Sequence, residues 1–353
     1  MHQELSNLAL FLRSYVYGKF ILADFKAYDT GKEGGYILIL IGDYTDEDVK
    51  VIERNRLFPR TIVYRDRGRL AVHLIAYERR EFPWLNVVMF VLTLISTFFA
   101  GALNVGADPF GWGILEGWVF ALPLLAILGA HEFGHYLVAR RYGIPASLPY
   151  FIPFPSLIGT MGAVIRLRGI LPSRRALLYM AFAGPIAGFI VALPILAVGL
   201  SMSQIVSPQL GGIKLVFGEP LIFKLMVKLV LGGVPEGKEL LIHPVAFAGW
   251  VGIFVTALNL IPLGQLDGGH ILYALLPRIH RKVGWAVILA MLPAGLLWNG
   301  WWVWAFIGIL MGPWHPPPIF NEREITTAEK VVGVISLLLL LLSFTLVPIK
   351  VQT

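Results

Sequence analysis

Long apolar runs, separated by short polar or glycine-rich stretches, fill the chain from residue 84 onward. A helix needs roughly 20 mostly apolar residues to cross a bilayer. The pattern predicts seven membrane spans, at residues 84–103, 118–139, 177–200, 244–276, 285–297, 301–311 and 331–347. The fifth and sixth runs are short and rich in aromatic residues, so a count of six spans is the alternative.

The first 82 residues show a different pattern, in which short apolar stretches alternate with charged ones. Thr45 precedes three acidic residues and is a plausible helix N-cap. Strands are predicted at residues 21–28, 36–41, 61–64 and 70–77, the last two joined by a turn at 66–68, and a helix is predicted at 46–57. We therefore expect a small α+β accessory domain at residues 1–82 and a membrane domain at residues 83–353.

Composition excludes an ordinary soluble protein. Hydrophobic residues make up 57% of the chain and charged residues only 14%, against about 25% charged in a typical soluble domain. Of the 51 charged residues, 25 lie within residues 1–83, which places the apolar excess in the rest of the chain. The chain has no cysteine, so any metal site must be built from histidine, aspartate or glutamate.

The net charge of +7 is explained by membrane orientation. Eleven basic residues fall in segments on one side of the predicted spans and five on the other. The positive-inside rule assigns the first side, which also carries the N-terminal domain, to the cytosol. No basic stripe with interleaved aromatic residues is visible, so no nucleic-acid partner is expected. The apolar run at residues 8–12 is too short for a secretory signal peptide.

Two histidines and a glutamate interrupt the second predicted span. His131, Glu132 and His135 form an HExxH motif, whose histidines lie on one face of a helix and can share a zinc ion. Zinc lowers the pKa of its bound water toward about 7, and the intervening glutamate can act as general base. Ionisable residues inside membrane spans are rare and usually functional. A helix-packing pair of histidines is therefore the weaker interpretation.

The fourth predicted span offers a third metal ligand. Asp267 is the only acidic residue in that span, and Pro262 with the neighbouring glycines must break the helix there. Irregular backbone at membrane depth is tolerated only around a cavity or inside protein. Counted from the basic residues that end each span, Asp267 and the histidine pair lie at similar depth, in the cytosolic half of the membrane. We therefore expect the two segments to meet.

The HExxH motif together with N-x-x-P-x-x-x-L-D-G at residues 259–268 resembles the intramembrane zinc metalloproteases of the site-2 protease family, peptidase family M50. The resemblance covers most of the chain from residue 84 and is closest to the branch without a PDZ insertion, found in archaea, bacteria and chloroplasts. It implies His131, His135 and Asp267 as ligands of one Zn²⁺ per chain and Glu132 as base. It also implies that Asn259 holds the substrate or stabilises the oxyanion. We expect a multi-pass protein of a prokaryotic plasma membrane.

Other histidines and glycines receive weaker assignments. His270 follows Asp267 by three positions and is at best a partner of the metal ligands. Gly184 and Gly188 form a GxxxG pair, whose ordinary meaning is close helix packing. Three further histidines are assigned to helix caps or solvated interfaces: His243, His280 and His315. His73 is assigned to a strand, without a catalytic role.

Two further segments bear on how a substrate could reach the site. Four prolines at positions 145–155 forbid a helix after the second span, and residues 160–167 read as a strand. The resembling family has a re-entrant sheet there, which could bind an unwound substrate by strand addition. A simple loop is the alternative. Residues 215–231, with Lys224 and Lys228, are predicted to form an interfacial amphipathic helix.

The functional hypothesis is hydrolysis of peptide bonds in or near transmembrane segments of membrane-protein substrates. Two alternatives from other classes are a metal-ion transporter that uses the same ligands and a non-catalytic membrane chaperone. Transporters usually show repeated halves with matching broken helices, whereas only one span here is broken. The intact Glu132 argues against the chaperone. Expected partners are transmembrane substrates and the lipid bilayer, and a homo-oligomer remains open.

Overall fold

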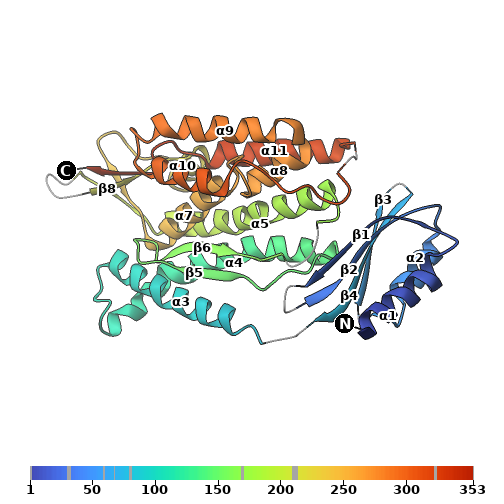
Figure 1. Cartoon of the computed structure of the whole chain (residues 1–353). Coiled ribbons are helices and arrows are strands. Elements are labelled where there is room, and N and C mark those ends of the chain that lie inside the picture. The colour runs from blue at the N-terminus through green and yellow to red at the C-terminus, as the bar shows by residue number, and fades with distance from the viewer. Residues whose placement is uncertain are drawn as a thin grey trace. The chain divides into compact units, whose positions relative to one another are not determined.

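The computed structural model describes residues 2–29, 33–58, 60–66, 68–78, 82–167, 171–208, 214–321 and 324–352. It divides into two compact units, residues 1–82 and residues 83–353 (Figure 1). Each has its own apolar core.

A four-stranded antiparallel sheet with helices forms the first unit, in the strand order β1-β2-β4-β3. Alternate residues of the central strands, such as Leu38 and Leu74, pack with Phe11 and Val49 from the helices. The elements are α1 (His2–Phe11), a π-helix (Leu12–Val16), β1 (Ile21–Asp29), β2 (Glu33–Ile41), α2 (Asp46–Glu53), β3 (Arg60–Asp66) and β4 (Arg69–Glu78).

The sequence predictions for this unit are largely confirmed. All four predicted strands form, and Thr45 caps α2 in a capping box with Asp48. Residue 67 of the predicted turn lies outside the described residues. Two points were wrong or missed. Helix α2 ends at Glu53 rather than at residue 57, because the Asn55 side chain accepts hydrogen bonds from the backbone of Leu57 and Phe58 and forms a turn. Helix α1 had not been predicted.

Helices dominate the second unit. In the part of the chain that the structure describes, three of them are long and apolar enough to cross a membrane, the second including a preceding 3₁₀ turn (Trp112–Gly117). They are α3 (Trp84–Val105), α4 (Trp118–Arg141) and α5 (Arg174–Ser201). The other helices are α6 (Leu221–Leu231), α7 (Pro244–Asn259), α8 (Asp267–Leu275), α9 (Pro277–Ala294), α10 (Gly300–Met311) and α11 (Thr327–Ser343). The predicted count of six or seven spans is not confirmed by these three.

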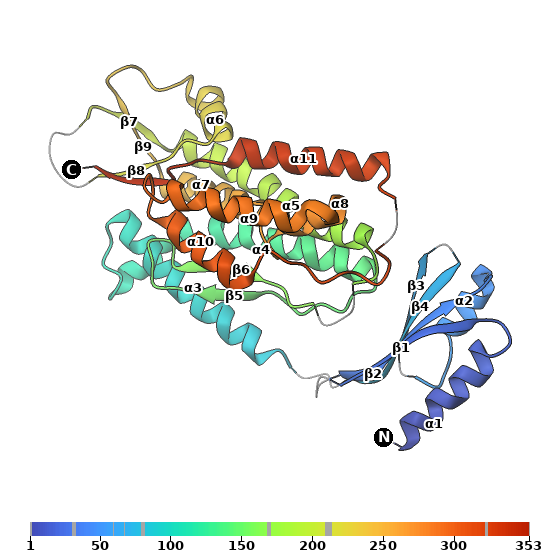
Figure 2. The ribbon, with the colours of Figure 1, turned by 45° about the horizontal axis from the view of Figure 1, so that its top comes forward.

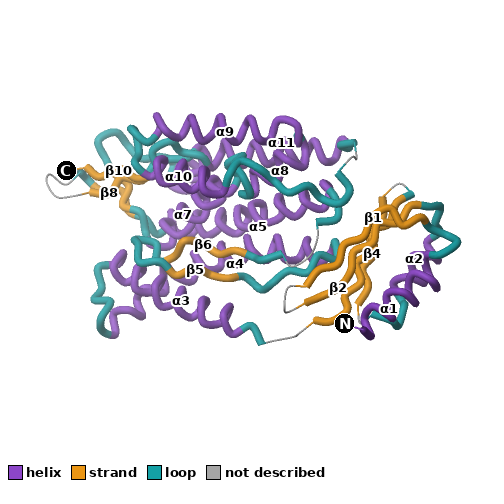
Figure 3. Tube along the Cα trace, in the orientation of Figure 1, coloured by secondary structure: helices purple, strands orange, loops and turns teal. Residues whose placement is uncertain are grey.

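Short antiparallel strand pairs flank the helices (Figure 3). The pairs are β5 (Tyr150–Pro153) with β6 (Thr160–Val164), β7 (Gln204–Val206) with β9 (Glu239–Leu241), and β8 (Lys214–Phe217) with β10 (Ile349–Gln352). The predicted strand at residues 160–167 is therefore present in its first part. The predicted helix at 215–231 was wrong in its first turn, because residues 214–217 pair with β10 and Pro220 precedes α6.

The centre of the second unit is a layer in which α5 packs between α4 and α7 (Figure 2). Fully buried residues from all three helices, among them Phe120, Leu196 and Trp250, fill this core. Because α4 and α7 contact each other as well as α5, the residues they carry on their inner faces come together.

The predicted break in the fourth span is confirmed. Helix α7 ends at Asn259, seven residues follow without helical structure, and α8 begins at Asp267. The intervening chain folds closely over the first turn of α8. A side chain at Gly268 would collide with the Leu260 carbonyl, so this approach requires glycine. The break therefore places Asn259 at the end of one helix and Asp267 at the start of the next.

Candidate metal centre

Helix α4 carries the two histidines of the HExxH motif on one buried face. The side chains of His131, Glu132 and His135 are all buried. One potential ligand atom from each residue lies within 4.8 Å of the others. The four-residue spacing of the histidines produces this arrangement, since residues i and i+4 are neighbours on a helix surface.

Asp267 joins this group from a segment far away in the sequence. Its Oδ2 atom lies 3.2 Å from His131 Nε2 and 3.3 Å from His135 Nε2. Only 13% of the Asp267 side chain is exposed. The structure thus brings together the three residues that the sequence analysis named as ligands.

Hydrogen bonding of the second ring nitrogen shows why these atoms fit a cation. His135 Nδ1 lies 2.8 Å from the Met180 carbonyl oxygen. A carbonyl can only accept, so Nδ1 carries a proton, and in the neutral ring that binds a metal Nε2 would turn its lone pair toward Asp267. The two Nε2 atoms and the carboxylate oxygen face one another stably only with a positive charge between them, which a proton or a metal ion supplies.

The spacing of the donor atoms is compatible with a bound zinc ion. Zinc binds histidine nitrogen and carboxylate oxygen at about 2.0–2.2 Å, in tetrahedral geometry, which separates neighbouring ligand atoms by roughly 3.3–3.5 Å. The separations of 3.2 and 3.3 Å in the structure are close to this range. Two neutral imidazoles and one carboxylate also form one of the usual zinc donor sets.

Two further polar side chains lie beside these donors. Glu132 Oε2 is buried, and no hydrogen-bond partner is found for it among the described residues. Asn259 Nδ2 lies 3.4 Å from His131 Nε2. A buried carboxylate oxygen without a hydrogen-bond partner is energetically costly. Such an oxygen is expected where a water molecule or a substrate group completes the site.

A cavity of about 260 Å³ opens onto this group of residues. Its wall includes His131, Glu132, His135, Asn259 and Asp267. The remaining wall comes from the chain in and after β6, from α5, from the break before α8, and from α8 and α10. These lining residues are Ala163, Val164, Ile165, Leu167, Met180, Ala181, Gln265, Leu266, His270 and Met311. The cavity can therefore admit a peptide segment beside β6.

The glycine pair of α5, Gly184 and Gly188, packs directly against the two histidines of the HExxH motif. A side chain at Gly184 would overlap the imidazole of His135, and one at Gly188 would press against His131. The interpretation of the pair as a close helix contact agrees with this geometry. What the sequence did not reveal is that the neighbouring surface consists of the proposed metal ligands.

Several residues at the site were missed or undervalued in the sequence analysis. Met180 orients His135 through its backbone carbonyl, which no residue type signals. His315 had been assigned to an interface, yet its Nε2 atom lies 2.7 Å from Nδ1 of the cavity residue His270. His243 caps the N-terminus of α7, which agrees with its assignment to a helix cap or a solvated interface. His73 lies in β4 of the first unit, where Tyr28 contacts it.

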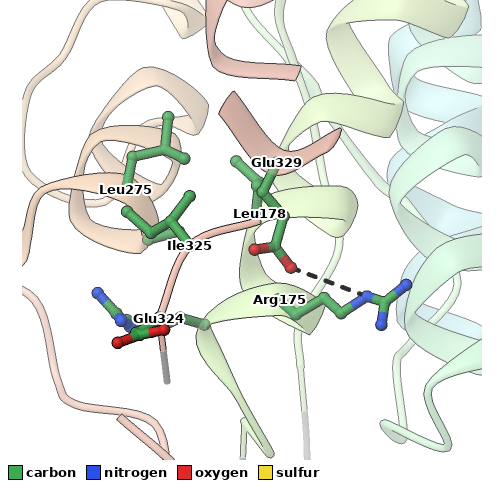
Figure 4. Close-up of a pocket in the computed structure, with 8 residues that line it drawn as sticks. Arg175, Leu178, Leu275, Glu324, Ile325 and Glu329 are labelled. Carbon is green, nitrogen blue, oxygen red and sulfur yellow. Dashed lines mark ion pairs between the residues drawn. The ribbon is translucent and has the colours of Figure 1, made fainter. Parts of the chain in front are cut away.

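A separate small pocket joins the first turns of α5 and α11. Figure 4 shows the Arg175 guanidinium directed at Glu329, with a nitrogen–oxygen distance of 3.9 Å. Glu329 also accepts a hydrogen bond from the Thr326 backbone, which caps α11. The pocket volume is only about 10 Å³. This group of charges therefore holds two helix ends and offers no room for a ligand.

The chain is similar to a known peptidase family and to several zinc metalloproteases. Residues 119–294 match the model of peptidase family M50. "Probable zinc metalloprotease EGY2, chloroplastic" from Oryza sativa subsp. indica is 35% identical over 224 residues, which cover 61% of this chain and 39% of that protein. The Arabidopsis thaliana protein of the same name is 32% identical over 237 residues, covering 65% of this chain and 41% of its own length.

A third relative, "Probable zinc metalloprotease EGY1, chloroplastic" from Arabidopsis thaliana, is 37% identical over 158 residues, with 42% of this chain and 29% of the relative covered. The chain thus spans about two fifths or less of the length of these curated relatives. No solved structure matches it.

Proposed function

We propose that this chain, a member of peptidase family M50 through residues 119–294, is a zinc metalloprotease that cleaves peptide bonds in or near membrane-spanning segments of other proteins. The observation that carries the proposal is the convergence of His131 Nε2 and His135 Nε2 on Asp267 Oδ2, with Glu132 beside them. This group lies among long apolar helices, which is where a protease of membrane segments needs it.

In this proposal His131, His135 and Asp267 hold one Zn²⁺. When bound, zinc supplies Lewis acidity at the scissile carbonyl and makes water a stronger nucleophile at neutral pH. The Met180 carbonyl keeps the His135 ring in the tautomer that binds metal. Asp267 brings the negative charge that offsets the cation in an apolar environment.

Glu132 and Asn259 act on the reacting groups. The Glu132 carboxylate takes a proton from the attacking water and later delivers it to the leaving amine nitrogen. The Asn259 side-chain amide, next to His131, donates a hydrogen bond to the substrate carbonyl oxygen as negative charge develops there.

Substrate binding falls to β6 in this proposal. One edge of β6 pairs with β5, and among the described residues no strand pairs with its other edge. The chain that continues from β6 forms part of the cavity wall. An unwound substrate segment can add to this edge as a further strand, which exposes its peptide bonds to the site.

The chain is a membrane protein, and in our proposal it crosses the membrane several times with residues 1–82 in the cytosol. The basic residues of the connecting segments support this orientation. The comparisons give no support to the expected prokaryotic plasma membrane, because the relatives' names place those proteins in chloroplasts. The branch without a PDZ insertion stays a prediction.

The test compares the wild type with the Glu132→Gln variant, each co-expressed with a reporter protein that has a single transmembrane helix, and measures cleavage of the reporter. Cleavage should fall by at least about 100-fold, in the range typical for loss of a general base, while zinc content is kept. Glu116→Gln is the matched control, since Glu116 is exposed and lies outside the cavity. Equal cleavage by Glu132→Gln and wild type, or zinc uptake into vesicles that depends on Asp267 without any cleavage, would contradict the proposal.

A further inference from the structure

His270 and His315 form a hydrogen-bonded pair at the edge of the cavity. His270 is one helical turn after Asp267 on α8, and it forms part of the cavity wall. Its Nδ1 atom lies 2.7 Å from His315 Nε2, and His315 Nδ1 lies 2.6 Å from the Pro316 carbonyl oxygen. The three groups therefore form a chain that runs from a backbone carbonyl to the cavity.

The chemistry of these groups fixes where each proton lies. The Pro316 carbonyl can only accept, so His315 Nδ1 carries a proton. Burial lowers the pKa of His315 to about 4, so that its ring is neutral near pH 7 and its Nε2 atom is an acceptor. His270 Nδ1 must then donate, and a neutral His270 keeps an unprotonated Nε2.

The pair is also held rigidly. The His315 ring stacks on Tyr273 of α8, with centroids 4.4 Å apart, and meets the His270 ring edge-on at 4.8 Å. The segment that follows His315 is tied down by hydrogen bonds from the backbone of Ile319 and Phe320 to Leu171 and Pro172. The orientation of His270 is thus determined by packing as well as by the hydrogen bond.

We propose that His270 Nε2 accepts a hydrogen bond from a backbone N–H of the substrate near the scissile bond, and that His315 is the positioning residue that keeps this atom unprotonated. Among the described residues, none hydrogen-bonds His270 Nε2. An unwound peptide brings N–H groups into the cavity, and each needs an acceptor there. This inference rests on the proposed function in one respect, namely that the molecule bound by His270 is a peptide substrate.

The proton positions can be tested without any cleavage. Full-length, zinc-free chain labelled with ¹⁵N-histidine contains eight histidines, and His270→Gln assigns the signals of residue 270. We expect His270 to show a protonated Nδ1 and an unprotonated Nε2. His315→Gln, which keeps an acceptor, should preserve this pattern, and His315→Phe, which keeps only the ring, should lose it. A proton on His270 Nε2 in the wild type would overturn the proposal.

Kinetics of reporter cleavage test the role of the acceptor. Glutamine places an oxygen where Nε2 lies, so His270→Gln should keep the wild-type KM. His270→Phe and His315→Phe should raise KM by about 3- to 10-fold, as expected for one lost hydrogen bond, with kcat changed less than about 2-fold. His243→Asn, a distant helix cap, is the matched control.

Two results would contradict the proposal. Loss of zinc from His270→Phe would make His270 a metal ligand, and a fall in kcat at unchanged KM would remove the substrate-binding role. Failure of the wild type to cleave any reporter would count against the proposed function alone, because the ¹⁵N measurement stands without it.

Discussion

The absence of a side chain at one position determines how the proposed metal ligands are held. Gly184 lets α5 approach α4 so closely that the imidazole of His135 occupies the space where a β-carbon would be. The same close approach brings the Met180 carbonyl, one turn earlier on α5, to His135 Nδ1. Gly184 and Met180 together therefore fix the ring in position and in tautomer.

Gly184→Ala should remove zinc binding. The added methyl group collides with His135 Nε2, and the ring must leave the position in which it faces Asp267. We expect zinc content to fall by at least about 10-fold, in line with the loss of a well-oriented ligand, and cleavage to fall with it. Gly129→Ala is the control, because a β-carbon there meets no atom within 4 Å. Full zinc occupancy in Gly184→Ala would refute this packing argument.

His73 gives the first unit a dependence on pH. Burial lowers its pKa from 6.5 to about 4, so the folded unit favours the neutral ring. Stability is complete above pH 6.5 and decreases as the pH falls toward 4, because the unfolded chain binds a proton that the folded chain does not. The loss is at most about 3 kcal/mol.

Hydrogen exchange of β2 and β4, corrected for intrinsic rates, measures this loss in the full chain. His73→Gln should flatten the profile, since glutamine keeps a group that can bond Tyr28 but does not titrate. An unchanged pH profile in this variant would assign the effect to another group.

Among the elements, the hairpin of β5 and β6 and the break between α7 and α8 shape the cavity. Strand β6 has one edge with which no described strand pairs, and the break turns one apolar segment into two helices whose ends meet the site. A continuous helix through residues 260–266 would move Asp267 along the helix axis, away from the histidines. Irregular backbone is therefore a requirement of the site.

Strand addition at β6 predicts a two-residue period in the substrate. Side chains and backbone groups alternate along a strand, so N-methylation of successive peptide bonds near the cleavage site should reduce cleavage at every second position. Each blocked hydrogen bond is expected to reduce kcat/KM by about 3- to 10-fold. Equal effects at all positions would indicate recognition of side chains instead of the backbone.

Some of these structural features can be predicted from the sequence and others cannot. The proline and glycines at 262–269 predict the break, and the HExxH spacing predicts that both histidines lie on one face of a helix. Both features follow from local backbone rules. The contacts of Met180 with His135 and of His315 with His270 come from segments 45 residues apart in each case. Such pairs depend on how helices pack, and no local pattern encodes them.

At the scale of the whole molecule, three helices of the described residues meet the length and apolarity of a membrane span, whereas the sequence pattern predicts six or seven. The shorter apolar helices α7 and α10 fall below that length. The break between α7 and α8 divides one predicted span into two helices, and α10 with 12 residues and α11 with 17 residues are too short by themselves.

Membrane orientation can be tested directly because the chain has no cysteine. Three spans after a cytosolic first unit place residues 202–208 on the opposite side. Ser207→Cys should react with a membrane-impermeant maleimide in intact cells, and Ser14→Cys only after lysis, since both positions are exposed in the structure. The cysteine-free wild type is the control for background labelling. Labelling of both positions from the same side would overturn the predicted orientation.

The distance in sequence between the proposed metal ligands also has a consequence for biogenesis. His131 and Asp267 are 136 positions apart, so the ribosome has produced both histidines long before the aspartate exists. A nascent chain that has inserted only α3 to α5 offers an incomplete set of donors. In the proposed function, peptide-bond cleavage can therefore begin only after the segment that carries Asp267 has been made, so the order of translation keeps shorter nascent chains inactive.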